Sequence, residues 1–348
     1  MKKILSALLL AAVSMPSMAA DKEAEGLAYY LPKTVVNVKL LIEKTTFTPG
    51  QLALYSDLYF KKPASDEASE SYRIVGYTFS TTALPDSSKM FRVPIDKKHT
   101  ILTVDCDRNG VLKAINAKGT EAEKPVPFSP APKAAKLNPA DYMSQDILAS
   151  GNEQKMARMV AQEIYDIRDS RNQLSRGEAD FMPKDGEQMK LMLGQLNTQE
   201  AALMQLFEGT TERDTTEATL TYVPEKENLK QVLFRFSKHL GLVDSDDMAG
   251  EPYYVVVSDE HVVPTLPAGF ADDTKKKTEF NVGVSLPGKI RLTITHNSQK
   301  QASFETDAAQ FGRTELLSES LFSKKMTAHV VLDPVTGTVV RLESEPTE

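Results

Sequence analysis

One short acidic segment comes closest to a known chemistry, the binding of calcium. Asp105 and Asp107 stand at positions one and three of an EF-hand-like loop, and Asn109 stands at position five. Gly110 follows at position six, but the twelfth position, which should be a bidentate Glu, is Asn116. Both flanks alternate like strands, whereas an EF-hand has helices there. We therefore predict a tight hairpin turn, with a calcium ion held by Asp105, Asp107 and Asn109 as the alternative.

Catalytic motifs are missing from the rest of the chain. The five histidines include no HExxH pair, and there is no G-x-S-x-G, S-x-x-K, Walker or dinucleotide-binding glycine motif. The single cysteine, Cys106, lies in a predicted strand with no base specified beside it, so we expect a structural thiol. A Ser-His-Asp triad can still assemble from distant residues. The sequence thus favours a protein that is not an enzyme and that uses no cofactor other than the calcium alternative.

The first twenty residues are predicted to be a cleaved secretory signal peptide. Lys2 and Lys3 precede an apolar run from Ile4 to Val13, and small residues lead to Ala20. An apolar run of about ten residues is too short to span the ~30 Å core of a bilayer. No cysteine follows the predicted cleavage site, so the chain is not expected to be a lipoprotein. We expect a periplasmic or secreted protein without a membrane span.

The composition excludes several classes of protein. The 348 residues include 41 Lys and Arg against 48 Asp and Glu, and loss of the leader with its two lysines changes the formal net charge from −7 to −9. This acidic balance argues against a nucleic-acid partner, because proteins that bind nucleic acids neutralise phosphates with basic patches. A single cysteine excludes an intrachain disulfide and a cysteine-rich zinc site.

Residues 21–120 are predicted to form an N-terminal β domain with a short helix. Thr34–Glu43 alternates apolar and polar side chains with a period of two, which is typical of a half-buried strand. Thr48 is predicted to cap a helix, with Pro49 in its first position and Gln51 closing a capping box. Further strands are predicted at Tyr72–Phe79, Met90–Ile95, Thr100–Cys106 and Val111–Ala117.

A proline-rich linker, residues 121–145, separates this domain from a predicted helical hairpin at residues 146–210. Five prolines lie between Lys118 and Tyr142, and proline favours extended backbone because it fixes φ and removes a hydrogen-bond donor. We expect this linker to be a semi-rigid strap over the surface of the protein.

The hairpin is predicted from helical periodicity and from signals at the helix ends. Ser150–Glu153 forms a capping box before the first helix, and Gly177 fits the residue just past its end. Asp185 caps the second helix, and Gly209 ends it. The apolar stripes carry four methionines, which suit adaptable contacts with a partner protein or with a second copy of the chain. These candidate partner-binding residues are Met156, Met159, Met189 and Met192. The alternative is that both stripes pack against each other and against a sheet.

Residues 211–348 are predicted to form a C-terminal β domain, in which the period of two returns. Its strands are predicted at Ala218–Val223, Lys230–Ser237, Tyr253–Ser258, Phe280–Ser285 and Lys289–His296, with a closing hairpin of Met326–Leu332 and Thr338–Glu343. The predicted fold class is α+β, with two mainly antiparallel β regions and an intervening antiparallel helical hairpin.

Several segments together resemble a family of exported Bacteroidetes proteins that is known only as a domain of unknown function. The segments that carry the resemblance are Gly26–Thr34, Glu43–Gly50, Ile164–Arg171, Leu203–Gly209, Ala309–Arg313 and Asp333–Gly337. They lie at both ends and in the middle of the chain, so the resemblance covers nearly all of it after the leader. It implies an exported protein of a Gram-negative anaerobe and brings no established catalytic residues.

Two functions follow as hypotheses. The first is a non-enzymatic binding or assembly module of the bacterial envelope or extracellular space, which recognises a protein, a peptide or a glycan. The alternative is an envelope hydrolase with a site at the junction of the two β regions, which would need a histidine within reach of a Ser, Asp or Glu.

Overall fold

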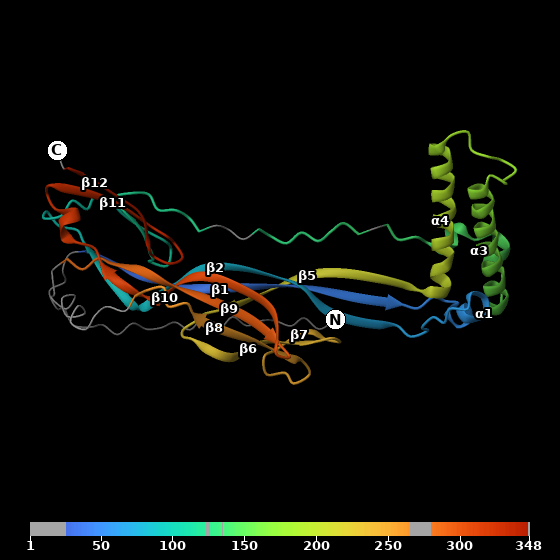
Figure 1. Ribbon diagram of the computed structural model, residues 1–348, viewed down its shortest axis with the longest axis horizontal. Coiled ribbons are helices and arrows are strands. Elements are labelled where there is room, and N and C mark those ends of the chain that lie inside the picture. Colours follow the sequence, from blue (N-terminus) through green and yellow to red (C-terminus); the bar gives the residue numbers. More distant parts are fainter. Residues whose placement is uncertain (1–25, 123–125, 134, 265–279, 347–348) are drawn as a thin grey trace.

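The protein is a long rod that carries helices at one end (Figure 1). The computed structural model describes residues 26–122, 126–133, 135–264 and 280–346. The predicted signal peptide, residues 1–20, lies outside these described residues. The strand pairs of the described sheets are antiparallel, and the fold is α+β with a helical hairpin, so the predicted fold class is confirmed.

A sheet of three long strands forms the axis of the rod. The central strand, β1 (Gly26–Thr48), lies between β2 (Ser69–Pro94) and β5 (Thr210–Tyr222). At about 3.3 Å per residue, the 23 residues of β1 extend over roughly 75 Å. Figure 1 shows this sheet running from the β end of the molecule to the helices.

A second sheet packs against the middle of this axis. Its strand order is β10-β9-β8-β6-β7, and the bounds are β6 (Asn228–Ser237), β7 (Gly241–Val243), β8 (Glu251–Asp259), β9 (Gly283–His296) and β10 (Gln299–Leu316). Alternate residues of β1, from Val36 to Ile42, bury their side chains against Ile290, Leu292 and Ile294 of β9. The period of two in both strands therefore produces the core between the two sheets.

A third sheet closes the β end of the rod. Its order is β12-β11-β4-β3, and the bounds are β3 (Val104–Cys106), β4 (Leu112–Ile115), β11 (Met326–Leu332) and β12 (Val339–Pro346). Tyr29 of β1 is fully buried in the core beneath this sheet, and its hydroxyl donates a 2.7 Å hydrogen bond to the carbonyl of Gly283.

The sheets combine strands from both predicted β regions. β5 follows the helices in the sequence but pairs with β1, and β11 pairs with β4. Backbone hydrogen bonds therefore join residues 21–120 to residues 211–348.

The described helical end consists of two long antiparallel helices and four short elements. The long helices are α3 (Glu153–Arg176) and α4 (Gly186–Glu208). The short elements at their base are the 3-10 helices η1 (Ala53–Tyr55) and η2 (Pro139–Tyr142) and the helices α1 (Ser56–Phe60) and α2 (Gln145–Leu148). The Asp185 side chain caps α4, and Gly177 ends α3 with a φ of 76°, as predicted. None of the described helices is long and apolar enough to cross a membrane.

The predicted start of the short helix at Thr48 is wrong, although a helical stretch does follow, as the 3-10 helix η1 and α1. Thr48 is the last residue of β1 and pairs with Thr210, and α1 begins eight residues later. The Leu52 N–H donates to the Leu206 carbonyl at 2.7 Å, and a Cβ atom on Gly50 would lie 2.2 Å from that oxygen. Close packing against α4 thus holds the segment in an open turn and overrides the local capping signal.

Two strands also differ from those expected from the sequence. The strands predicted at Tyr72–Phe79 and Met90–Ile95 belong to the single strand β2, which contains an irregularity where the Asp86 side chain accepts hydrogen bonds from Ser88. The strand β10 was not predicted, because few of its residues are large and apolar.

The proline-rich linker is an extended strap beside the long sheet. Figure 1 shows it running between the β end and the helices. Lys133 and Lys136 form ion pairs with Asp214 and Glu212 of β5, and Lys39 Nζ lies 3.5 Å from the Val126 carbonyl. These contacts explain how a segment with little apolar side chain remains close to the sheet.

Asn116 holds together the strands at the β end. Its φ is 53°, in the left-handed region that Asn tolerates better than most residues. Its side-chain oxygen accepts from the N–H of Leu102 at 2.7 Å, and its amide donates to the carbonyls of Thr100 at 2.7 Å and Ala328 at 2.9 Å. One side chain therefore connects β4 to the chain before β3 and to β11.

We expect Asn116→Ala to lower the free energy of unfolding by about 2–4 kcal/mol, because it leaves several partly buried backbone groups unpaired and disfavours the left-handed conformation. Chemical denaturation measures the effect. Asn109→Ala, an exposed asparagine whose side chain has no described hydrogen bond, is the matched control and should change the free energy by less than about 0.5 kcal/mol. Equal effects of the two substitutions would contradict this role of Asn116.

Candidate functional site

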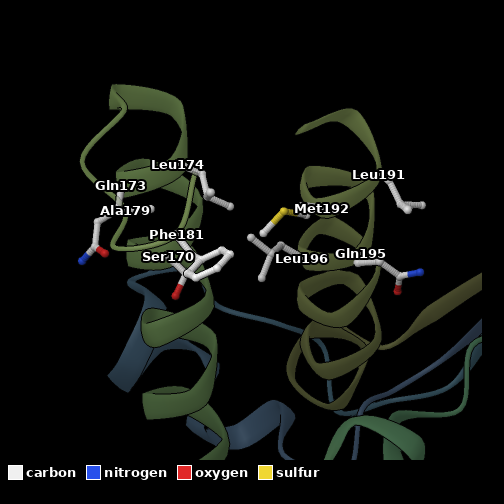
Figure 2. A pocket seen from close by; sticks show the side chains of 9 residues that line it. All are labelled: Ser170, Gln173, Leu174, Ala179, Phe181, Leu191, Met192, Gln195 and Leu196. Atoms are coloured by element: carbon white, nitrogen blue, oxygen red, sulfur yellow. The ribbon is translucent and has the colours of Figure 1, made fainter. Parts of the chain in front are cut away.

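An apolar cleft lies between α3 and α4 near the free end of the hairpin. Its volume is about 470 Å³, and its lining comes from both helices and from the loop that joins them. Figure 2 shows the lining residues, which are Ser170, Gln173, Leu174, Ala179, Phe181, Leu191, Met192, Gln195 and Leu196. These side chains include no charged group, so the cleft is suited to apolar ligands with a few neutral hydrogen-bonding groups at its edge.

Large apolar side chains at this cleft are open to solvent. Phe181 in the loop is 87% exposed and Leu191 on α4 is 65% exposed, whereas Leu174 on the opposite helix is 5% exposed. In Figure 2, Met192 and Leu196 extend from α4 toward α3, and Phe181 lies between the helices. Exposed apolar side chains grouped around a concave surface mark a place where another molecule can remove them from water.

An ion-pair latch closes the helix pair below the cleft. Glu200 of α4 accepts from Arg168 Nε at 2.6 Å and from an Arg171 terminal nitrogen at 2.5 Å. The same Arg171 nitrogen lies 3.1 Å from Asn197 Oδ1. The Glu200 side chain is only 15% exposed, so these contacts are partly shielded from water. The latch fixes the spacing of the helices where the cleft begins.

Below the latch the hairpin is closely packed. Ile164 and Phe207 are fully buried, and the ring of Phe60 from α1 meets Phe207 edge to face at 4.9 Å. The Arg168 guanidinium lies over the Phe60 ring at 5.4 Å. The base is therefore closely packed, and the cleft lies above it, between the last turns of α3 and the first turns of α4.

The four predicted methionine contacts separate in the structure. Met192 lines the cleft. Met156 and Met159 pack against the buried core of the helix base, and Met189 is half-buried outside the cleft lining. Phe181 and Leu191 were not predicted from the sequence. Their apolar character was the available signal, because neither a phenylalanine in a polar loop nor a leucine outside the apolar stripe of its helix is needed for a core.

The acidic turn at Asp107 uses its carboxylate for the backbone. Asp107 Oδ1 accepts from the N–H groups of Asn109 and Val111, both at 2.8 Å. Asp105 Oδ2 accepts from the Gly119 N–H at 2.9 Å, and Asp105 Oδ1 lies 3.6 Å from Lys113 Nζ. In the described parts of the chain, no group of three or more His, Cys, Asp and Glu side chains is placed to hold a metal. The arrangement supports the hairpin-turn interpretation.

Several titratable residues outside the cleft have structural partners. His99 lies 2.8 Å from Asp96 and 3.3 Å from Glu319, and His296 Nε2 lies 2.9 Å from Glu251 Oε2. Burial raises the pKa of the Cys106 thiol above its ordinary value, so the thiol stays protonated at neutral pH. This agrees with a structural thiol rather than a nucleophile.

Comparison with known proteins identifies a family for nearly the whole chain. A family model described as Domain of unknown function (DUF4831) matches residues 25–340. No curated protein and no solved structure matches the chain.

We expect Glu200→Gln to lower the free energy of unfolding by about 1–2 kcal/mol, because it removes the charge that both arginines share in a partly shielded site. Hydrogen exchange should also become faster in the last turns of α3 and the first turns of α4. Glu163→Gln, at a half-buried α3 carboxylate with no described ion pair, is the control. Unchanged exchange at the helix ends in Glu200→Gln would refute the latch.

Addition of calcium to about 10 mM should leave the midpoint of thermal unfolding unchanged, because the turn already uses the carboxylates of Asp105 and Asp107. Differential scanning fluorimetry measures the midpoint. A calcium-dependent rise in the wild type that is lost in Asp107→Asn would instead establish the calcium site, since asparagine can still accept the backbone hydrogen bonds of the turn.

Proposed function

The chain belongs to the family described as Domain of unknown function (DUF4831), and we propose that it is a non-enzymatic binding or assembly module of the bacterial envelope or extracellular space. The observation that carries this proposal is the uncharged cleft between α3 and α4 with its exposed apolar side chains. The signal-peptide pattern of residues 1–20 supports the location. We assign the cleft to an apolar segment of a protein partner.

The chemistry of the cleft fits a peptide segment. Leu174, Met192 and Leu196 offer apolar walls for two or three large side chains, and methionine adapts to different shapes. The amides of Gln173 and Gln195 point to the outer sides of the two helices (Figure 2), and Gln173 Nε2 already donates to Asp169 at 2.7 Å. At the outer edge of the cleft, the Gln195 amide can still donate to a carbonyl and accept from an N–H of a bound segment. A helix or an extended segment with apolar anchors at regular spacing satisfies both requirements.

The rod gives this cleft its position. The helical hairpin lies at the far end of β1, β2 and β5 from the four-stranded sheet (Figure 1). The strap reaches the same end and bonds to β5 beside the base of α4. A binding surface carried at the end of a stiff sheet can reach a partner that the bulk of the protein does not touch, as an assembly module requires.

An envelope hydrolase is the second candidate, and one observation favours it. Glu251 of β8 and His296 of β9 lie 2.9 Å apart in the five-stranded sheet, which is the distance of an acid–base pair, and Glu251 lines a cleft that this sheet shares with β2. The ring of His296 stacks on Tyr253 at 4.2 Å, and the pair has no described contact with a serine or cysteine side chain. The binding module therefore remains the better-supported function.

A displayed peptide library can be selected for binding to the purified protein. The selected peptides should carry large apolar residues, and fluorescence polarisation should measure their binding to the wild-type protein. Leu191→Asp should weaken them by at least about tenfold, because it places a charge at the rim of an apolar site. Leu229→Asp is the matched control, since Leu229 is 93% exposed in β6, far from the cleft, and it should have no effect.

Two results would contradict the proposal. One is that every selected peptide binds the Leu191→Asp variant as tightly as it binds the wild type. The other is self-association: if sedimentation shows a wild-type dimer that Leu191→Asp converts to a monomer and Leu229→Asp does not, the occupant of the cleft is a second copy of the chain.

A further inference from the structure

We infer that a second cleft, between the long sheet and the five-stranded sheet, is a binding site for a neutral pyranose sugar. This site lies in the middle of the rod and is separate from the cleft of the helical hairpin, so it goes beyond the proposed function. Its volume is about 550 Å³, and its lining comes from β2, β6, β8 and β10 and from the loops beside them.

The floor of this cleft is aromatic. Tyr77 of β2 lies beside Phe236 and Tyr253 of the five-stranded sheet. Tyr253 is clamped between Phe234, at 4.6 Å, and His296, at 4.2 Å, so its ring is held in place. Both faces of the Tyr253 ring are covered, so only its edge and its hydroxyl are left for a ligand. A floor of ring edges and phenol groups suits a molecule with many hydroxyl groups better than it suits a compact ion.

The rim provides both hydrogen-bond donors and acceptors, and its charges are of both signs. Arg73 Nε donates to Glu43 at 2.8 Å, so the charge of Arg73 is offset nearby, and Glu251 lies 2.9 Å from His296. Gln301 adds an exposed amide, which can donate and accept at once. Lys238 at the mouth adds a charged donor, and its charge is opposite in sign to that of the Glu251 carboxylate. Such a rim matches a neutral ligand with many hydroxyl groups.

Two β-bulges aim side chains into this region. Val75 is an extra residue in β2 opposite β1, so Ile74 and Tyr77 both pack toward the five-stranded sheet although they are three residues apart. Gln301 is the extra residue at a second bulge, in β10. Bulges are common beside functional sites because they redirect individual side chains.

The hydroxyl of Tyr77 lowers the stability of the unliganded protein without an evident structural reason. It is buried and has no hydrogen-bond partner among the described residues, and a buried unpaired hydroxyl is unfavourable. A sugar hydroxyl at the cleft floor, reached by a small shift of the ring, would satisfy it. The phenol is therefore better explained by a ligand than by the folded chain alone.

Saturation-transfer difference NMR tests the site with maltose, cellobiose and N,N′-diacetylchitobiose as neutral probes and glucuronic acid as a charged probe. At least one neutral disaccharide should bind at about 10 mM or below. Gln301→Ala should weaken it at least about fivefold, whereas Gln299→Ala, an exposed neighbour outside the lining, should not.

Tyr77→Phe separates a ligand contact from a structural role. It should weaken the sugar by about 3–10-fold while the unfolding midpoint of the free protein stays the same or rises, because the lost hydroxyl had no partner. Absence of transfer to all three neutral probes overturns the inference, as does equal binding by Gln301→Ala, or binding of glucuronic acid alone. Leu191→Asp should leave sugar binding unchanged, so this test fails or succeeds independently of the peptide cleft.

Discussion

The pairing of β1 with strands on both of its sides is the interaction on which the rest of the structure depends. β1 pairs with β2 along almost its whole length and with β5 from Val36 to Thr48. Its side chains enter the core at the β end through Tyr29 and the core between the sheets through Val38 and its neighbours. The chain then leads directly to Leu52 in the core of the helices. One strand therefore aligns three separate cores along one axis.

The long sheet contributes side chains to two of these cores, and its strands need interruptions so that the right side chains face each core. The bulge at Val75 keeps Tyr72 and Tyr77 on the same face, where strict alternation would have turned one of them outward. The irregularity at Asp86 does the same between the middle of the rod and the β end. The mid-rod cleft and the buried contacts of β2 are thus consequences of interruptions in the regular ladder.

The parts of the fold that sequence could predict are those governed by local rules. The last turn of α3 and the first turn of α4 were predictable because Gly177 and Asp185 act on backbone groups within a few residues. The predicted capping box at Ser150 was wrong, because the Asn152 side chain caps α3 instead. The partners of β1 were not predictable, because hydrogen bonds to β5 join residues separated by more than 160 positions. The cleft depends on side chains of both helices and of the loop between them, and the contact of Arg168 with Glu200 that joins the helices below it is not revealed by periodicity.

Beyond the five-stranded sheet, the axis continues toward the helices as a ribbon of three strands (Figure 1). The described core clusters include no β1 residue from 43 to 48, and cross-strand charge pairs add to the backbone hydrogen bonds of this ribbon. Glu43 of β1 bonds to Arg73 on β2 at 2.8 Å and lies 3.8 Å from Arg213 on β5, and Lys44 pairs with Glu70 at 2.7 Å. The hydrogen bond from Arg73 holds the pKa of Glu43 below its usual range, which keeps the carboxylate charged between its two partners. The same charges make the outer strands poor templates for another sheet. The ribbon can therefore be long and exposed without becoming an aggregation site, and the helical hairpin can be held at a distance from the β cores.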